Sequence, residues 1–122
     1  MPNYNAQLPP YAVNPGDVAL AFNNESPSSG QASQQFALAN YSGFPENGRT
    51  VRWQTIYASS PSAVNVALQS AMVDSDSEYS TIDASTATGG EARTVTSVRG
   101  NFLRAKVSSI TGGSGITVQF LG

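Results

Sequence analysis

The 122-residue chain contains neither cysteine nor histidine, and each absence excludes a class of chemistry. Without cysteine there are no disulfides, no thiolate nucleophile and no cysteine-ligated zinc site. Without histidine there is no Ser-His-Asp or Cys-His arrangement and no histidine metal site. Most familiar hydrolase mechanisms are therefore excluded, and we expect no enzymatic activity, no cofactor and no bound metal.

The chain is also poor in charge, since only 11% of its residues are charged and its net charge is −2. It has one lysine, whereas a nucleic-acid binder normally presents a basic face. No apolar run approaches the roughly 20 residues that span a bilayer, and the first residues lack the basic start and apolar stretch of a secretory signal. We expect a soluble chain that binds neither nucleic acid nor membrane.

Uncharged polar residues take the place of charge, because Ser, Thr, Asn and Gln together number 42. A polar but nearly neutral surface repels other copies of itself only weakly. The composition is compatible with dense packing of subunits. It fits a neutral extracellular or linker-like β domain equally well.

The composition changes near residue 48. Six of the seven prolines precede that point, while all six basic residues lie at Arg49 or later. Proline removes a backbone hydrogen-bond donor, and serine and glycine favour turns. We predict an extended arm over residues 1–48, with at most two short strands at residues 17–22 and 34–39, followed by a β domain over residues 49–122.

In the second part apolar and polar residues alternate over short runs, the pattern of half-buried strands. The runs predict strands at residues 51–57, 64–69, 79–83, 93–98, 101–110 and 116–121. The glycine-rich residues 111–115 predict that the last two strands form a hairpin. The fold class is therefore all-β, an antiparallel β-sandwich or jelly-roll-like domain with an extended N-terminal arm.

The acidic run at residues 74–78 is a candidate calcium loop, because Asp74, Asp76 and Glu78 alternate and carboxylate oxygens are the ligands that calcium prefers. The EF-hand pattern fails, since Tyr79 stands where the tight-turn glycine should be and Ser85 where the bidentate glutamate should be. A solvated hairpin loop is the simpler interpretation.

Two aromatic pairs, Trp53 with Tyr57 and Tyr41 with Phe44, are candidate platforms for stacking on a sugar ring. Core packing is the stronger explanation for a single tryptophan in a mid-chain strand, because aromatic side chains dominate burial in small β domains. A carbohydrate-binding sandwich stays open as an alternative function.

The C-terminal half carries a resemblance. Residues 101–113 read NFLRAKVSSITGG, and residues 116–122 read ITVQFLG. With VNVALQSAM at residues 64–72 and YSTID at residues 79–83, they resemble the strands that end small structural proteins of tailed bacteriophages. There the linking loop usually reads Asp-Gly-x-x-Trp, whereas residues 74–79 lack the glycine and carry Tyr79 in place of the tryptophan. The resemblance does not extend over residues 1–48.

The resemblance implies a virion component of sandwich architecture, and a capsid decoration or cement protein is the member of that group that suits an extended arm. Such a protein is made in the host cytoplasm and sits on the capsid exterior, bound across junctions of the major capsid protein, here as a homotrimer. The arm would add strands to sheet edges of a neighbouring subunit. A head-tail neck part or a tail or fibre-base component is the alternative within the same group.

The candidate assembly contacts are aromatic residues of the arm and arginines of the body, because arginine pairs bidentately with carboxylates on a neighbour. Scattered solvated charge is the alternative interpretation of the arginines. The candidates are Tyr4, Tyr11, Phe22, Phe36, Arg52, Arg99 and Arg104.

Overall fold

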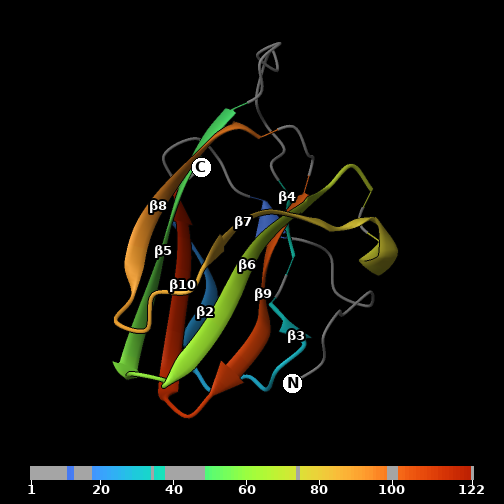
Figure 1. The fold of residues 1–122 in the computed structure, drawn as a ribbon. Coiled ribbons are helices and arrows are strands. Elements are labelled where there is room, and N and C mark those ends of the chain that lie inside the picture. The colour runs from blue at the N-terminus through green and yellow to red at the C-terminus, as the bar shows by residue number, and fades with distance from the viewer. Residues whose placement is uncertain are drawn as a thin grey trace.

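The computed structural model describes residues 11–12, 18–33, 35–37, 49–73, 75–98 and 102–121. Within these ranges ten strands form two sheets that pack face to face, and the helical content is a short 3-10 turn (Figure 1). This arrangement confirms the predicted all-β sandwich. Among the same residues, no helix has the length and apolar character that crossing a membrane requires.

The described strands divide into a six-stranded and a four-stranded sheet. The six-stranded sheet has the order β1-β4-β9-β6-β7, with β3 also paired to β9, and the four-stranded sheet has the order β2-β10-β5-β8. In both sheets neighbouring strands pair antiparallel, except that β1 and β4 of the six-stranded sheet pair parallel. The six-stranded sheet consists of β1 (Tyr11–Ala12), β3 (Gln31–Ala32), β4 (Phe36–Ala37), β6 (Ala63–Ala71), β7 (Ser80–Ser85) and β9 (Phe102–Thr111). The other contains β2 (Val18–Glu25), β5 (Arg49–Ser59), β8 (Glu91–Val98) and β10 (Ser114–Leu121), and the 3-10 turn is η1 (Asp76–Glu78).

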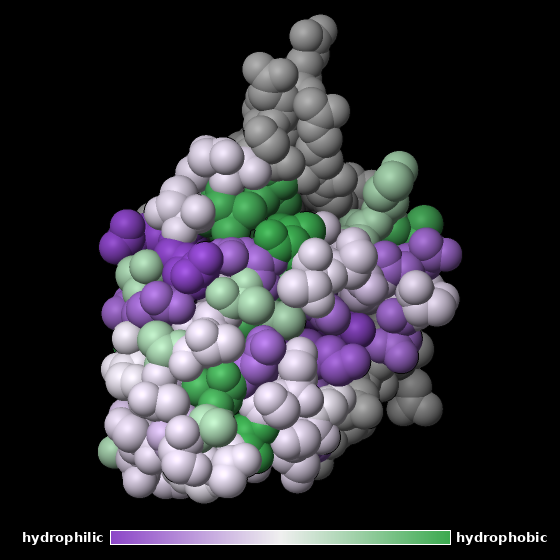
Figure 2. Space-filling view, in the orientation of Figure 1, coloured by the Kyte–Doolittle hydropathy of each residue, from purple (hydrophilic) through white to green (hydrophobic). Residues whose placement is uncertain are grey.

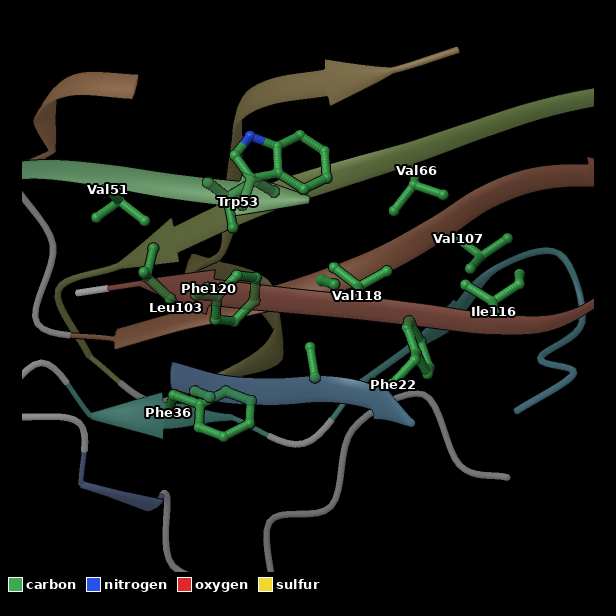
Figure 3. Close-up of a cluster of buried hydrophobic side chains, with 14 of the residues drawn as sticks. Phe22, Phe36, Val51, Trp53, Val66, Leu103, Val107, Ile116, Val118 and Phe120 are labelled. Carbon is green, nitrogen blue, oxygen red and sulfur yellow. The ribbon is translucent and has the colours of Figure 1, made fainter. Parts of the chain in front are cut away.

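The core lies between the sheets and follows the period-2 pattern of the sequence. In the four-stranded sheet Trp53 on β5 and Phe120 on β10 are directly opposite in the ladder, and both are buried (Figure 3). Phe36 of the other sheet meets the Phe120 ring edge-on, with centroids 5.6 Å apart and planes at 90°. The remaining inward side chains are mainly aliphatic and include Val51, Val66, Leu68, Leu103, Ala105, Val107, Ile116 and Val118.

Residues 1–48 were predicted to form an extended arm separate from the body, but the described strands of that segment belong to the two sheets. β2 is an edge strand of the four-stranded sheet, paired with β10, and β3 and β4 pair with β9. Phe22 is fully buried and Phe36 is 4% exposed. The prolines do not prevent this, because Pro15 and Pro27 flank β2 rather than interrupt it. The other residues of the segment lie outside the described ranges.

The predicted hairpin at residues 111–115 is wrong, because β9 and β10 belong to different sheets. The glycine-rich segment instead carries the chain from one layer to the other, beside the crossing between β5 and β6. There the Ser62 N–H donates to the Thr111 carbonyl at 2.9 Å. Gly113 has a φ of +75°, and a Cβ at that position would stand 2.7 Å from the Pro61 nitrogen. Glycine is therefore required by both the backbone angle and the close approach of the two crossings.

A second correction concerns the outward face of β6 and β9, which alternation predicts to be solvated. Ala67, Gln69 and Arg104 are buried there. The segment between β6 and β7, which contains η1, provides the contacts to Arg104 that explain its burial.

Candidate functional site

The buried arginine on the outward face is the centre of a polar cluster, called here the Arg104 cluster: Arg104, Gln69, Asp76, Tyr79 and Thr81. The ladder between β6 and β9 places Gln69 directly opposite Arg104. Arg104 Nε donates to Gln69 Oε1 at 2.8 Å, and a terminal guanidinium nitrogen lies 2.7 Å from Asp76 Oδ1. Gln69 Nε2 in turn donates to Thr81 Oγ1 at 3.3 Å.

The same guanidinium lies over the Tyr79 ring, 4.2 Å from its centroid, which adds a cation–π interaction. Asp76 and Tyr79 belong to or border η1, whereas Gln69 and Arg104 belong to the sheet. The arginine side chain is 3% exposed and the Asp76 side chain 60%. Arg104 therefore fixes the segment at residues 75–79 to the face of the sheet.

A second cluster, called here the Asp83 cluster, lies where the edge strand of one sheet meets that of the other: Asp83, Ser85, Trp53, Glu91 and Arg93. Arg93 Nε donates to Asp83 Oδ2 at 2.8 Å, and its second terminal nitrogen donates to Asp83 Oδ1 at 3.0 Å. Trp53 Nε1 donates to Asp83 Oδ2 at 2.9 Å. The Ser85 hydroxyl donates to Glu91 Oε1 at 2.7 Å, and Arg93 also contacts that oxygen at 3.3 Å.

This bidentate geometry determines the protonation of Asp83. Burial by itself raises the pKa of Asp83, but hydrogen bonds from Arg93, Trp53 and the Ala84 backbone N–H outweigh burial and lower its pKa below the ordinary value of 3.8. The hydrogen bond and charge of Asp83 likewise raise the pKa of Arg93. The cluster therefore joins β7 to β5 and β8 and closes one edge of the sandwich with an ionised pair.

The structure brings together few of the predicted assembly contacts. Phe22 and Phe36 are core residues, and Arg104 is 2% exposed and paired within its own chain. Arg52 is exposed on the outward face of β5, opposite Thr94 in the ladder. The backbone of Tyr11 pairs with that of Phe36. Tyr4 and Arg99 lie outside the described residues, and contact of any of the seven with a neighbouring subunit stays a prediction.

The sequence offered two candidate ligand sites, a calcium loop at residues 74–78 and aromatic platforms for a sugar ring. Within the described ranges there is no group of three His, Cys, Asp or Glu side chains placed to hold a metal ion. Asp76 is paired with Arg104, and Asp74 lies outside those ranges. Trp53 is buried, as the core-packing interpretation predicted, so its ring offers no stacking surface to a sugar. Tyr41 and Phe44 lie outside the described residues.

Sequence reasoning missed Gln69, Asp83 and the role of Arg93. Each stands at a polar position of an alternating strand, where solvation is the ordinary expectation. Gln69 pairs with Arg104, and Asp83 pairs with Arg93; in both cases the partner lies ten or more residues away in the chain. The replacement of tryptophan by Tyr79 in the linking loop is the one local signal, because an aromatic ring after η1 suits contact with an arginine.

Comparison with known proteins bears on the fold. No protein-family model matches the chain. No curated protein matches its sequence. The crystal structure of SPBc2 prophage-derived protein YomS is similar, with a TM-score of 0.55 over 85% of this chain and 90% of that chain. The identity is 12%, so the likeness shows a shared sandwich fold.

Proposed function

We propose that the chain is a structural protein of a bacteriophage particle, and within that class a capsid decoration or cement protein that binds across junctions of the major capsid protein. The observation that carries this proposal is the fold likeness to a prophage-derived protein, which extends over nine tenths of that protein's chain. The resemblance of residues 64–122 to the strands of phage structural proteins supports the same class.

The described polar groups support a role in binding. The two charge clusters hold strands and a turn of this chain in place, and the three described carboxylates that pair with arginine, Asp76, Asp83 and Glu91, are engaged in that way. The outward face of the four-stranded sheet is nearly uncharged and carries the exposed side chains of Leu20 and Ile56. Neutral surfaces of this kind suit packing among many subunits.

Cementing requires no chemistry beyond selective binding. A protein that binds the assembled lattice and not its separate subunits stabilises the lattice by mass action. Since β2, β3 and β4 are paired within the body, the contacts would be made by sheet faces and loops rather than by a free strand from residues 18–37. A homotrimer at a local threefold junction, on the capsid exterior, is the arrangement we propose.

The test is the number of copies in purified particles, measured by quantitative mass spectrometry against the major capsid protein. A ratio of copies on the order of one to one or one to three supports cementing, because decoration follows the symmetry of the lattice. About a dozen copies would place the protein in the neck or tail instead. Absence from the particles overturns the proposal, and glycan-array binding by the isolated protein would favour receptor recognition.

A further inference from the structure

β8 is an edge strand of the four-stranded sheet, and among the described strands it pairs with β5 alone. From Glu91 to Val95 that pairing is regular, with one residue of β5 opposite each residue of β8. Thr55 Oγ1 lies 3.2 Å from the Glu91 nitrogen and 3.5 Å from the Glu91 carbonyl oxygen, so the backbone groups of Glu91 face β5. Because these groups alternate in direction along a strand, those of Ala92 and Thr94 face the open edge.

The side chains along this edge are small and uncharged where they face solvent. Ala92, Thr94 and Thr96 are exposed on the outward face. On the inward face Arg93 is held by Asp83 of β7, a side-chain contact that leaves the backbone edge of β8 unpaired. Lysine, proline and bulges usually protect an edge strand, and this part of β8 has none of them. Figure 2 shows mostly pale surface, of intermediate hydropathy, at the lower left, beside the end of β5 and the turn that precedes β8.

The opposite edge of the same sheet is protected. In β2 the Asn23 N–H donates to the Glu25 carboxylate at 3.2 Å, and Asn24 has a positive φ of 52°. The pairing of β2 with β10 also contains two register shifts. Such irregularities interrupt the straight row of donors and acceptors with which another strand would pair. Of the two edges of this sheet, β8 is therefore the one suited to pairing with a further strand, and the β2 edge of another copy is a poor partner for it.

We propose that β8 pairs antiparallel with β8 of a second copy of the chain, about a twofold axis that passes beside Thr94. An antiparallel edge is complementary to itself, because a half rotation places its donors against its acceptors. Residues whose backbone faces the edge must meet residues of the same kind, so Thr94 lies opposite the partner's Thr94, and Ala92 lies opposite the partner's Thr96. Arg93 then lies opposite a valine, the partner's Val95, rather than opposite another arginine, which avoids directly opposed like charges.

This inference goes beyond the proposed function and does not depend on it, since the pairing needs only two copies of the chain. The four-stranded sheets of the two copies would continue as one sheet across the axis. On a capsid, the same contact would join copies that belong to neighbouring trimers, because a twofold contact and a threefold contact use different surfaces of the chain.

The first test uses the absence of cysteine from the chain, which makes one introduced cysteine the only thiol. Thr94→Cys is expected to form a disulfide-linked dimer of the isolated protein under mild oxidation, because the two copies of this position meet at the axis. Thr96→Cys is the matched control, an exposed threonine of the same strand whose two copies would lie about 13 Å apart along the strands. We expect the Thr94→Cys dimer to form at least about tenfold faster than the Thr96→Cys dimer.

The second test measures association without a cross-link, by sedimentation equilibrium of the isolated protein. Thr94→Lys replaces an exposed side chain and places two lysines directly opposite each other at the axis, so it is expected to weaken the wild-type dimer at least about tenfold. The same substitution at Thr111, an exposed residue at the end of β9 in the other sheet, is the control and is expected to leave the dimer unchanged.

Equal rates of disulfide formation for Thr94→Cys and Thr96→Cys overturn the pairing, because random collisions between copies treat the two positions alike. A Thr94→Lys protein that dimerises as strongly as wild type also overturns it and assigns the dimer to another surface. The number of copies in purified particles tests the proposed function separately, so either proposal can fail while the other stands.

Discussion

Arg104 and Arg93 each pair with an aspartate, and the two arginine–aspartate pairs differ in which member is buried. The Arg104 side chain is almost fully buried while its partner Asp76 is mostly exposed. The Arg93 side chain is 39% exposed, and its partner Asp83 is 16% exposed. In the first pair the buried Arg104 belongs to the sheet, and it binds Asp76 in the segment between β6 and β7. In the second pair a carboxylate inside the sandwich edge is compensated by an arginine from outside.

The effect of a substitution on the free energy of unfolding depends on whether it removes the buried or the exposed member of the pair. Burying a charge is costly, and the cost is offset only by partners placed around it. Removing the buried member eliminates both the cost and the contacts, and it leaves other buried groups without partners. Removing the exposed member leaves a buried charge with fewer partners. We therefore expect the largest loss of stability when Arg104 is replaced and the smallest when the exposed Asp76 is replaced.

The largest effect is expected for Arg104→Met. The substitution leaves Gln69 Oε1 buried without its donor, removes the contact with the Tyr79 ring and releases η1 from the sheet. We expect a loss of about 3 kcal/mol in the free energy of unfolding, measured by urea denaturation. The loop should also exchange its backbone hydrogens faster. A variant as stable as wild type would show that the cluster contributes only specificity.

Asp83→Asn is expected to cost about 2 kcal/mol, because the bidentate pair with Arg93 becomes a neutral contact while the Trp53 N–H keeps an acceptor. The measurement is again urea denaturation, at pH 7. Thr81→Ala in the same strand is a suitable control, since it removes a contact of the other cluster. A loss for Thr81→Ala as large as that for Asp83→Asn would contradict the importance of the ion pair.

The pH dependence of stability follows from the same pair. Since the pKa of Asp83 is lower in the folded chain than in the unfolded chain, its contribution is present above the unfolded value of 3.8 and is lost as the pH falls through the folded value. The melting temperature of the wild type should therefore fall more steeply below about pH 4 than that of Asp83→Asn. Parallel curves for the two proteins would contradict the assignment.

The smallest effect is expected for Asp76→Asn, about 1 kcal/mol, because the amide oxygen still accepts from Arg104 and the side chain is largely solvated. The neighbouring Glu78→Gln, which has no described ion pair, serves as the control and should be within about 0.5 kcal/mol of wild type. A loss of stability for Asp76→Asn as large as that for Arg104→Met would show that the charge of the exposed Asp76 carboxylate, and not the burial of Arg104, dominates the contribution of this pair.

Part of the site could have been expected and part could not. Alternation placed Val51, Trp53 and Thr55 on one face, and that face is the core. Alternation also predicted that Arg104 faces solvent, and this prediction is wrong. The period of two within β9 carries no information about the segment between β6 and β7, which packs over that face and buries Arg104. The hairpin prediction failed for a related reason, since β9 and β10 each have one apolar face and would show the same pattern whether paired side by side or facing each other across the core.

What the sequence by itself determined is the fold class, the positions of most strands and the apolar face of each, because these follow from a period of two within one segment. Only the tertiary structure decided which strands share a sheet, that β2 to β4 belong to the body, and that Gln69, Asp83 and two arginines form clusters. These depend on contacts between distant segments, whose free energy is set by burial and geometry that no local pattern records.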